Sequence, residues 1–159
     1  MSGTWALVPI KPLAEAKTRL AEALDATRRQ ELVLAMARDV LAALVESDAC
    51  SRVVIVSAMP EINRLIAVSG VSALDPSPIR GLNQELAYSA DWAYGHGARH
   101  VLIAHADLPA IAPRAVQAFI DPLPEAGTLR LAASKEGTGT NMLLSSVPLP
   151  VPLQFGKDS

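Results

Sequence analysis

The chain of 159 residues has one cysteine, Cys50. A single thiol excludes an internal disulfide framework and a zinc site made of several cysteines, and it is typical of the reducing cytoplasm. We therefore expect a cytoplasmic protein. Cys50 lies beside the start of an expected strand, and we interpret it as an unreactive thiol rather than a nucleophile.

Aromatic residues make up only 4% of the chain, and the net charge is −2. Few aromatic rings argue against a stacking platform for single-stranded nucleic acid, and the charge gives no general positive field. We expect no nucleic-acid partner. No long uncharged apolar run could cross a bilayer and no signal-peptide pattern is present, so we expect no membrane association.

Half of the residues are hydrophobic, which is enough for the core of one domain. Short apolar runs alternate with segments of helical periodicity. Such a pattern is typical of parallel strands covered by helices on both faces, so we predict a three-layer α/β fold with a mostly parallel central sheet. The expected strands are 4–10, 52–56, 71–74, 101–106, 129–133 and 142–145. The expected helices include 60–66, 83–94 and 113–120.

A further helix is expected after Thr27, because Thr27 and Gln30 fit a capping box. Its apolar face would consist of Leu32, Val33, Met36, Val40, Leu41 and Leu44. The proline-rich stretch 147–156 is unsuited to a central strand and favours an extended edge or crossing segment.

Several common functional motifs are missing. No Gly-x-Gly-x-x-Gly follows the first strand, and no phosphate-binding P-loop or nucleophile elbow is present. His96, His100 and His105 are spaced by four and five residues, but glycine breaks any helix there and they share no face, so we interpret them as surface or partly buried residues rather than zinc ligands.

Three cations follow the first strand, at the edge of the sheet where ligands bind in α/β proteins. Lys11, Lys17 and Arg19 are either solvated surface charges or the side chains that bind a polyphosphate. Their position favours the second interpretation.

Two later loops allow a functional and a structural interpretation. Asp107 ends an apolar strand, where a carboxylate could bind Mg²⁺ or could cap the following turn. In the loop 137–141, Thr138 and Thr140 alternate with glycine, which allows close approach of an anion but also fits a flexible hairpin connection.

Five segments occur in an order that resembles the CofC-type guanylyltransferases, which make a guanylated phosphocarboxylate precursor of coenzyme F-420. They are VPIKPLAEAKTRLA (8–21), GLNQEL (81–86), ADLP (106–109), GTGTN (137–141) and FGKDS (155–159). The resemblance spans nearly the whole chain. It implies a Rossmann-like, GT-A-like nucleotidyltransferase fold.

The resemblance also implies a reaction. The phosphate of 2-phospho-L-lactate, phosphoenolpyruvate or 3-phosphoglycerate would attack the α-phosphorus of GTP and expel pyrophosphate. Asp107 would bind Mg²⁺, and Lys17 and Arg19 would act with it in catalysis. The nucleotide would contact Lys11, Lys17, Arg19, Gly81 and Asn83. The acceptor would contact Thr140, Gly156 and Ser159.

Members of that family continue past the FGxxS segment to a second acidic metal site, whereas this sequence ends at Ser159. We expect one domain over residues 1–159 without that C-terminal segment; the family suggests a homodimer. Two alternatives stay open. One is a non-catalytic or weakened GTP-binding module, and the other is a nucleotidyltransferase with a different acceptor, although such relatives generally have a glycine-rich first loop.

Overall fold

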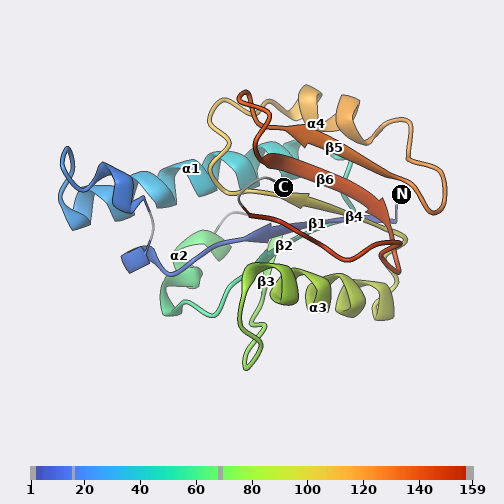
Figure 1. Ribbon diagram of the computed structural model, residues 1–159, viewed down its shortest axis with the longest axis horizontal. Coiled ribbons are helices and arrows are strands. Elements are labelled where there is room, and N and C mark those ends of the chain that lie inside the picture. The colour runs from blue at the N-terminus through green and yellow to red at the C-terminus, as the bar shows by residue number, and fades with distance from the viewer. Residues whose placement is uncertain (1–2, 16, 68–69, 157–159) are drawn as a thin grey trace.

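The computed structural model describes residues 3–15, 17–67 and 70–156. Within these residues, six strands form one sheet with helices on both faces (Figure 1). The strands are β1 (Thr4–Pro9), β2 (Arg52–Val56), β3 (Val71–Leu74), β4 (His100–Ala104), β5 (Leu129–Ala133) and β6 (Thr140–Ser146). The α-helices are α1 (Ala26–Glu46), α2 (Asn63–Ile66), α3 (Leu82–Gly95) and α4 (Pro113–Ile120). The short 3-10 helices are η1 (Leu13–Glu15), η2 (Thr18–Leu20) and η3 (Pro60–Ile62).

The strand order is β3-β2-β1-β4-β6-β5. The first four of these strands are parallel, and β6 runs antiparallel to both β4 and β5. The predicted α/β architecture with a mostly parallel sheet is therefore confirmed. The chain moves outward from β1 to β3 and then returns to place β4 on the other side of β1. Such a reversal leaves a crevice at the carboxyl ends of the two central strands.

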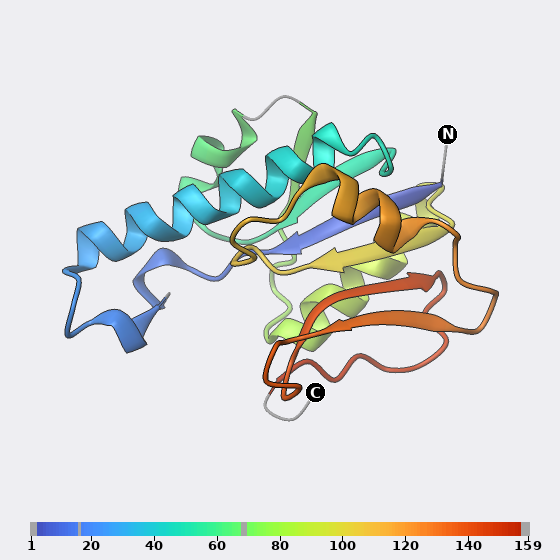
Figure 2. The same cartoon turned by 90° about the horizontal axis from the view of Figure 1, so that it is seen from above.

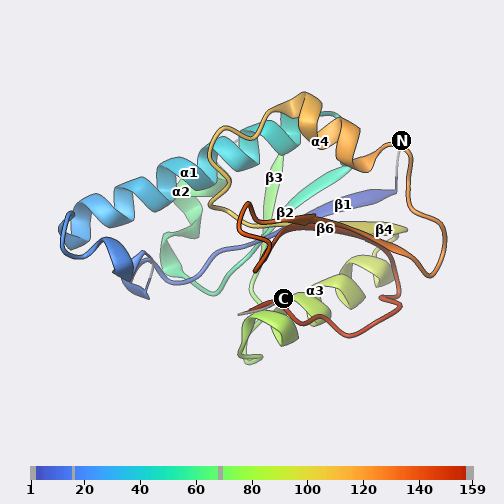
Figure 3. The ribbon, with the colours of Figure 1, turned by 45° about the horizontal axis from the view of Figure 1, so that its top comes forward.

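Two apolar layers cover the sheet, because alternate strand residues point to opposite faces. In β1, Ala6 and Val8 belong to the core beneath α1 and α4, whereas Trp5 and Leu7 belong to the core beside α3. Figures 2 and 3 show α1 and α4 on one side and α3 on the other. Burial on both faces explains why β1, β2 and β4 read as nearly continuous apolar runs.

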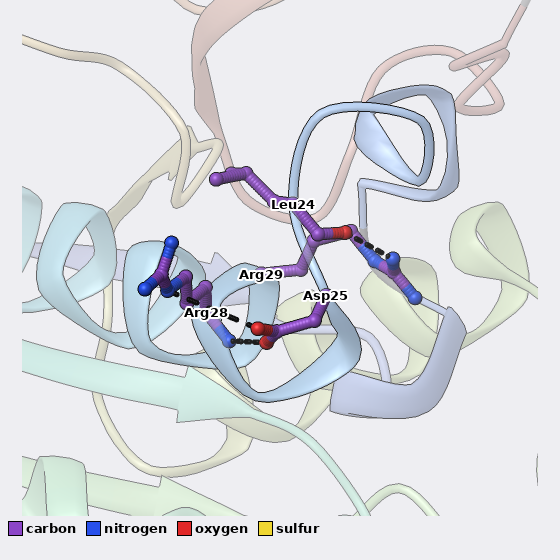
Figure 4. Close-up of polar contacts among 4 residues, drawn as sticks. All are labelled: Leu24, Asp25, Arg28 and Arg29. Atoms are coloured by element: carbon purple, nitrogen blue, oxygen red, sulfur yellow. Dashed lines mark hydrogen bonds and ion pairs between the residues drawn. The ribbon is translucent and has the colours of Figure 1, made fainter.

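Helix α1 begins earlier than the sequence predicted, and the capping box at Thr27 is wrong. Asp25 is the N-cap, and its Oδ1 accepts a hydrogen bond from the Arg28 amide at 2.8 Å (Figure 4). A carboxylate here satisfies an unpaired amide and also opposes the positive end of the helix dipole. Arg29 donates to the Leu24 carbonyl at 2.7 Å and so fixes the entry of the chain into the helix.

The predicted apolar face of α1 is correct except at one end. Val33, Val40, Leu41 and Leu44 are buried, whereas Leu32 is 36% exposed. A residue in a helix turns about 100° from its neighbour, and Leu32 lies on the side of Val33 away from the core. The first turns of α1 extend with the loop before them beyond the carboxyl ends of the strands (Figures 1 and 2).

The proline-rich stretch after β6 contains no strand. As an extended crossing segment it runs back beside α3 (Figures 1 and 3). Leu149, Leu153 and Phe155 pack against the core on that face. None of the helices in the described ranges has the length and apolar character needed to cross a bilayer.

Candidate active site

A cavity of about 310 Å³ lies at the carboxyl ends of β1 and β4. Its position is the crevice that the strand order creates between these two strands. Residues from five parts of the chain line it: Pro9, Ile10, Lys11, Lys17, Val33, Met36, Leu82, His105, Ala106 and Asp107.

The segment that places Lys11 is fixed to the neighbouring strand. The Ile10 amide donates to the Val56 carbonyl at 3.1 Å, and the buried Ser57 hydroxyl donates to the Ile10 carbonyl at 2.8 Å. The backbone before Lys11 is therefore held through both the amide and the carbonyl of Ile10, while the Lys11 side chain remains exposed at the cavity.

Asp107 lies in a turn just after β4, and its neighbours fix its position. Ala106 and Leu108 pack against the core beneath α1 and α4. Between them the Asp107 carboxylate faces the cavity, where Lys17 Nζ lies 2.7 Å from its Oδ2 atom. The two side chains are 90 residues apart in sequence, so the fold alone brings them together.

The charge state of this corner follows from its surroundings. Partial burial raises the pKa of Asp107, but the Lys17 hydrogen bond and charge outweigh it and leave the pKa below its usual value. Burial lowers the pKa of His105, and nearby Lys11 lowers it further while Asp107 acts in the opposite direction. Near neutral pH the site therefore contains an ionised carboxylate beside a neutral imidazole.

Lys17 and Arg19 lie on the loop that precedes α1. Lys17 adopts a positive φ of 52°, an uncommon conformation for a residue with a side chain, and reaches the cavity. Arg19 lies in η2 with an exposed side chain and does not line the cavity. The structure thus brings Lys11, Lys17 and Asp107 together and leaves Arg19 on the adjoining loop.

The start of α3 forms another wall. Gly81 precedes the helix with a φ of 97°, in the region that favours glycine, and Leu82 lines the cavity. Asn83 uses its side-chain amide within the protein: Nδ2 donates to the Phe155 carbonyl at 3.0 Å, and Oδ1 accepts from the Phe155 amide at 2.7 Å.

The threonine- and glycine-containing loop connects β5 to β6. The Gly139 amide donates to the Ser134 hydroxyl at 3.1 Å, so the geometry fits the hairpin interpretation and this amide already has a partner. Thr140 is the first residue of β6, and the next residue, Asn141, accepts a hydrogen bond from the His105 amide at 3.3 Å. Thr140 is therefore close to the strand end that precedes Asp107.

The remaining predicted acceptor residues lie at the end of the chain. Gly156 is exposed, directly follows Phe155 and has a φ of 148°. Ser159 lies outside the described residues. Sequence reasoning missed His105 as a site residue; its ring lines the cavity and packs edge-on against Phe155 with ring centroids 5.2 Å apart.

Within the described ranges, no group of three or more His, Cys, Asp or Glu side chains is placed to bind a metal ion. Asp107 is the acidic residue among the cavity-lining residues named above. A magnesium ion held with substrate needs only one or two protein carboxylates, because substrate phosphates and water complete its coordination. The site therefore fits a metal that enters with a nucleotide rather than one bound by the protein alone.

The fold and the position of the cavity define a nucleotidyltransferase-type α/β protein. A nucleotidyl transferase from Methanothermobacter thermautotroptrophicus superposes with a TM-score of 0.66 at 16% identity, over 97% of this chain and 77% of that one. A protein from Desulfovibrio desulfuricans G20, assigned as a nucleotide-diphospho-sugar transferase, has a TM-score of 0.72 at 18% identity, over 92% of this chain and 64% of that one. Rv0371C from Mycobacterium tuberculosis H37Rv, solved in complex with manganese, has a TM-score of 0.57 at 16% identity, over 92% of this chain and 72% of that one.

More specifically, the chain belongs to the CofC-like guanylyl transferase family, whose model matches residues 4–159. It is 37% identical over 156 residues to the phosphoenolpyruvate guanylyltransferase of Chloroflexus aggregans, across 96% of this chain and 76% of that protein. It is also 37% identical to the enzyme of that name from Sphaerobacter thermophilus, across 98% of this chain and 74% of that protein. The chain thus spans about three quarters of the length of these relatives.

Proposed function

We propose that this guanylyltransferase transfers GMP from GTP to the phosphate of phosphoenolpyruvate or a closely similar phosphocarboxylate, as a step of coenzyme F-420 biosynthesis. One observation supports this most directly: Lys11, Lys17 and Asp107 meet in one cavity at the carboxyl ends of β1 and β4. The acceptor is inferred from relatives at 37% identity that are named phosphoenolpyruvate guanylyltransferases.

The reaction forms one bond and breaks one. An oxygen of the acceptor phosphate bonds to the α-phosphorus of GTP, the bond between the α-phosphorus and its bridging oxygen breaks, and pyrophosphate leaves with that electron pair. A phosphate monoester has a second pKa of about 6, so the attacking group is already ionised near neutral pH. No general base is needed, and catalysis depends on position and on neutralisation of charge.

Each side chain then has a defined task. Lys11 and Lys17, which line the cavity, would neutralise the triphosphate, and Arg19, which lies outside the cavity lining, would contact it from the loop before α1. Asp107 would hold the divalent ion; a structural neighbour, Rv0371C, was solved in complex with manganese. When bound, Mg²⁺ would supply positive charge between the two anionic reactants.

The acceptor is assigned to the region of the start of β6, next to the strand end that precedes Asp107. Thr140 would bind it with a hydroxyl group, and Gly156 and Ser159 with backbone or hydroxyl donors. A homodimer, which the family resemblance suggests, stays a prediction.

The test is incubation with GTP, Mg²⁺ and each of phosphoenolpyruvate, 2-phospho-L-lactate and 3-phosphoglycerate in turn. We expect pyrophosphate release and a guanylated product of the corresponding mass with phosphoenolpyruvate, and no release when Mg²⁺ is chelated. Binding of GTP without turnover with any acceptor would instead indicate a non-catalytic GTP-binding module. Turnover only with a different type of acceptor phosphate would indicate another nucleotidyltransferase.

A further inference from the structure

We infer that Asn83 is a positioning residue for the acceptor, rather than a contact for the nucleoside. It holds the backbone of Phe155, and the Phe155 ring in turn packs against His105, which lines the cavity. This inference rests on the proposed function, because it concerns the acceptor side of the same site.

The geometry of the contact is that of a peptide pair. The Asn83 side chain donates to the Phe155 carbonyl at 3.0 Å and accepts from the Phe155 amide at 2.7 Å, across 72 residues of sequence. A primary amide presents one donor and one acceptor side by side, which matches the two groups of a backbone residue. Aspartate would keep only the acceptor, and alanine would keep neither.

The segment 148–156 depends strongly on this contact. Among the described residues, no hydrogen bond other than the two to Asn83 is found for the backbone of 148–156. Apolar packing of Leu149 and Leu153 holds the segment against the α3 face but does not fix its register at the cavity. Asn83 therefore fixes the backbone of Phe155, next to Gly156, which is assigned to the acceptor.

Phe155 connects this contact to the reacting centre. Its ring packs edge-on against His105, with centroids 5.2 Å apart and planes at 84°. His105 lines the cavity two residues before Asp107, and its amide donates to Asn141 beside Thr140. The Asn83 contact thus leads through Phe155 to His105, whose amide bonds beside Thr140, the residue assigned to the acceptor.

The experiment compares Asn83→Ala and Asn83→Asp with Gln84→Ala, an exposed neighbour in the same helical turn. Amide hydrogen exchange of the peptide containing Phe155 is measured first, because it requires no turnover. We expect faster exchange in Asn83→Ala than in the wild type and no change in Gln84→Ala. In Asn83→Asp, which keeps the acceptor for the Phe155 amide, we expect a smaller increase in exchange than in Asn83→Ala. Unchanged exchange in Asn83→Ala would overturn the inference.

Steady-state kinetics then separate the two substrates. Loss of two hydrogen bonds should raise the KM for phosphoenolpyruvate about 10-fold, with less than about a 3-fold change in the KM for GTP. A rise confined to the KM for GTP would mean that Asn83 contacts the nucleoside and would refute the positioning role. Unchanged thermal unfolding would show that all three variants are folded.

Failure of the proposed reaction can be distinguished from failure of the positioning role of Asn83. If the wild-type protein shows no turnover, calorimetric titration with phosphoenolpyruvate replaces KM. Weaker binding to Asn83→Ala than to the wild type would then retain the positioning role without the reaction. Equal binding to both proteins would reject the positioning role.

Discussion

Replacement of Asp107 by asparagine should separate activity from stability. The amide has nearly the same volume, so the main loss is the ion pair in which Lys17 Nζ lies 2.7 Å from the carboxylate. The two side chains are 33% and 51% exposed, and an ion pair this accessible contributes about 0–1 kcal/mol. Since 1 kcal/mol shifts the Tm of a domain of this size by about 2–4 °C, we expect Asp107→Asn to unfold within about 4 °C of the wild type.

Activity should fall much further. Removal of a fixed charge that stabilises the transition state typically lowers the rate by about 10²–10³-fold. We expect a loss of that order in kcat/KM, measured by pyrophosphate release over a Mg²⁺ titration. Asp91→Asn, an exposed acid on α3, is the matched control and should keep its activity.

The pH dependence gives an independent check of the ion pair. Because the folded state lowers the pKa of Asp107, its contribution to stability is present above the unfolded value of about 3.9 and is lost as the pH falls through the folded pKa. The Tm values of wild type and Asp107→Asn should therefore converge below about pH 4. Near-normal turnover with unchanged Mg²⁺ dependence in the variant would refute the metal assignment, and a Tm loss above about 8 °C would indicate a structural role.

Two other predictions concern parts of the fold outside the cavity. Asp25→Ala removes the N-cap of α1 and should cost about 1 kcal/mol, whereas Thr27→Ala should cost under about 0.5 kcal/mol in the same denaturant titration; equal costs would contradict the capping assignment. Burial raises the pKa of Cys50 to about 12. At pH 8 its reaction with a thiol reagent should therefore be at least ~100-fold slower in the folded than in the unfolded protein, and a fast native reaction would show that the thiol is accessible.

The strands were predictable because their composition is dictated by their surroundings. A strand buried on both faces must be apolar almost throughout, so 52–56 could be delimited from sequence alone. Helix 113–120 could also be delimited, because Pro113 suits a first helical turn. The start of α1 was misplaced because Asp25 and Thr27 are both good caps, and the choice between them depends on how the preceding loop meets the helix.

The candidate site was predictable in its parts but not in its contacts. The position of Lys11 and Asp107 after strands placed them at one edge of the sheet, since ligands bind there in α/β folds. The Asn83 contact with Phe155 could not be predicted, because no local pattern relates two residues 72 positions apart. His105 could not be predicted as a site residue either. Its spacing from the other histidines argued against a zinc site but gave no information about the cavity beside it.

The overall charge of the chain and the charge at the cavity lead to different expectations, and only the second bears on function. The chain has a net charge of −2, which predicts no affinity for polyanions. At the carboxyl ends of β1 and β4, however, Lys11 and Lys17 line one cavity with a single carboxylate, Asp107, and Arg19 lies on the adjoining loop. Since interactions between exposed charges are largely screened beyond about 8 Å in physiological salt, a triphosphate in this cavity would experience the local excess of cations and little of the distant acidic surface. A chain without a P-loop can therefore bind a nucleotide by side-chain charge.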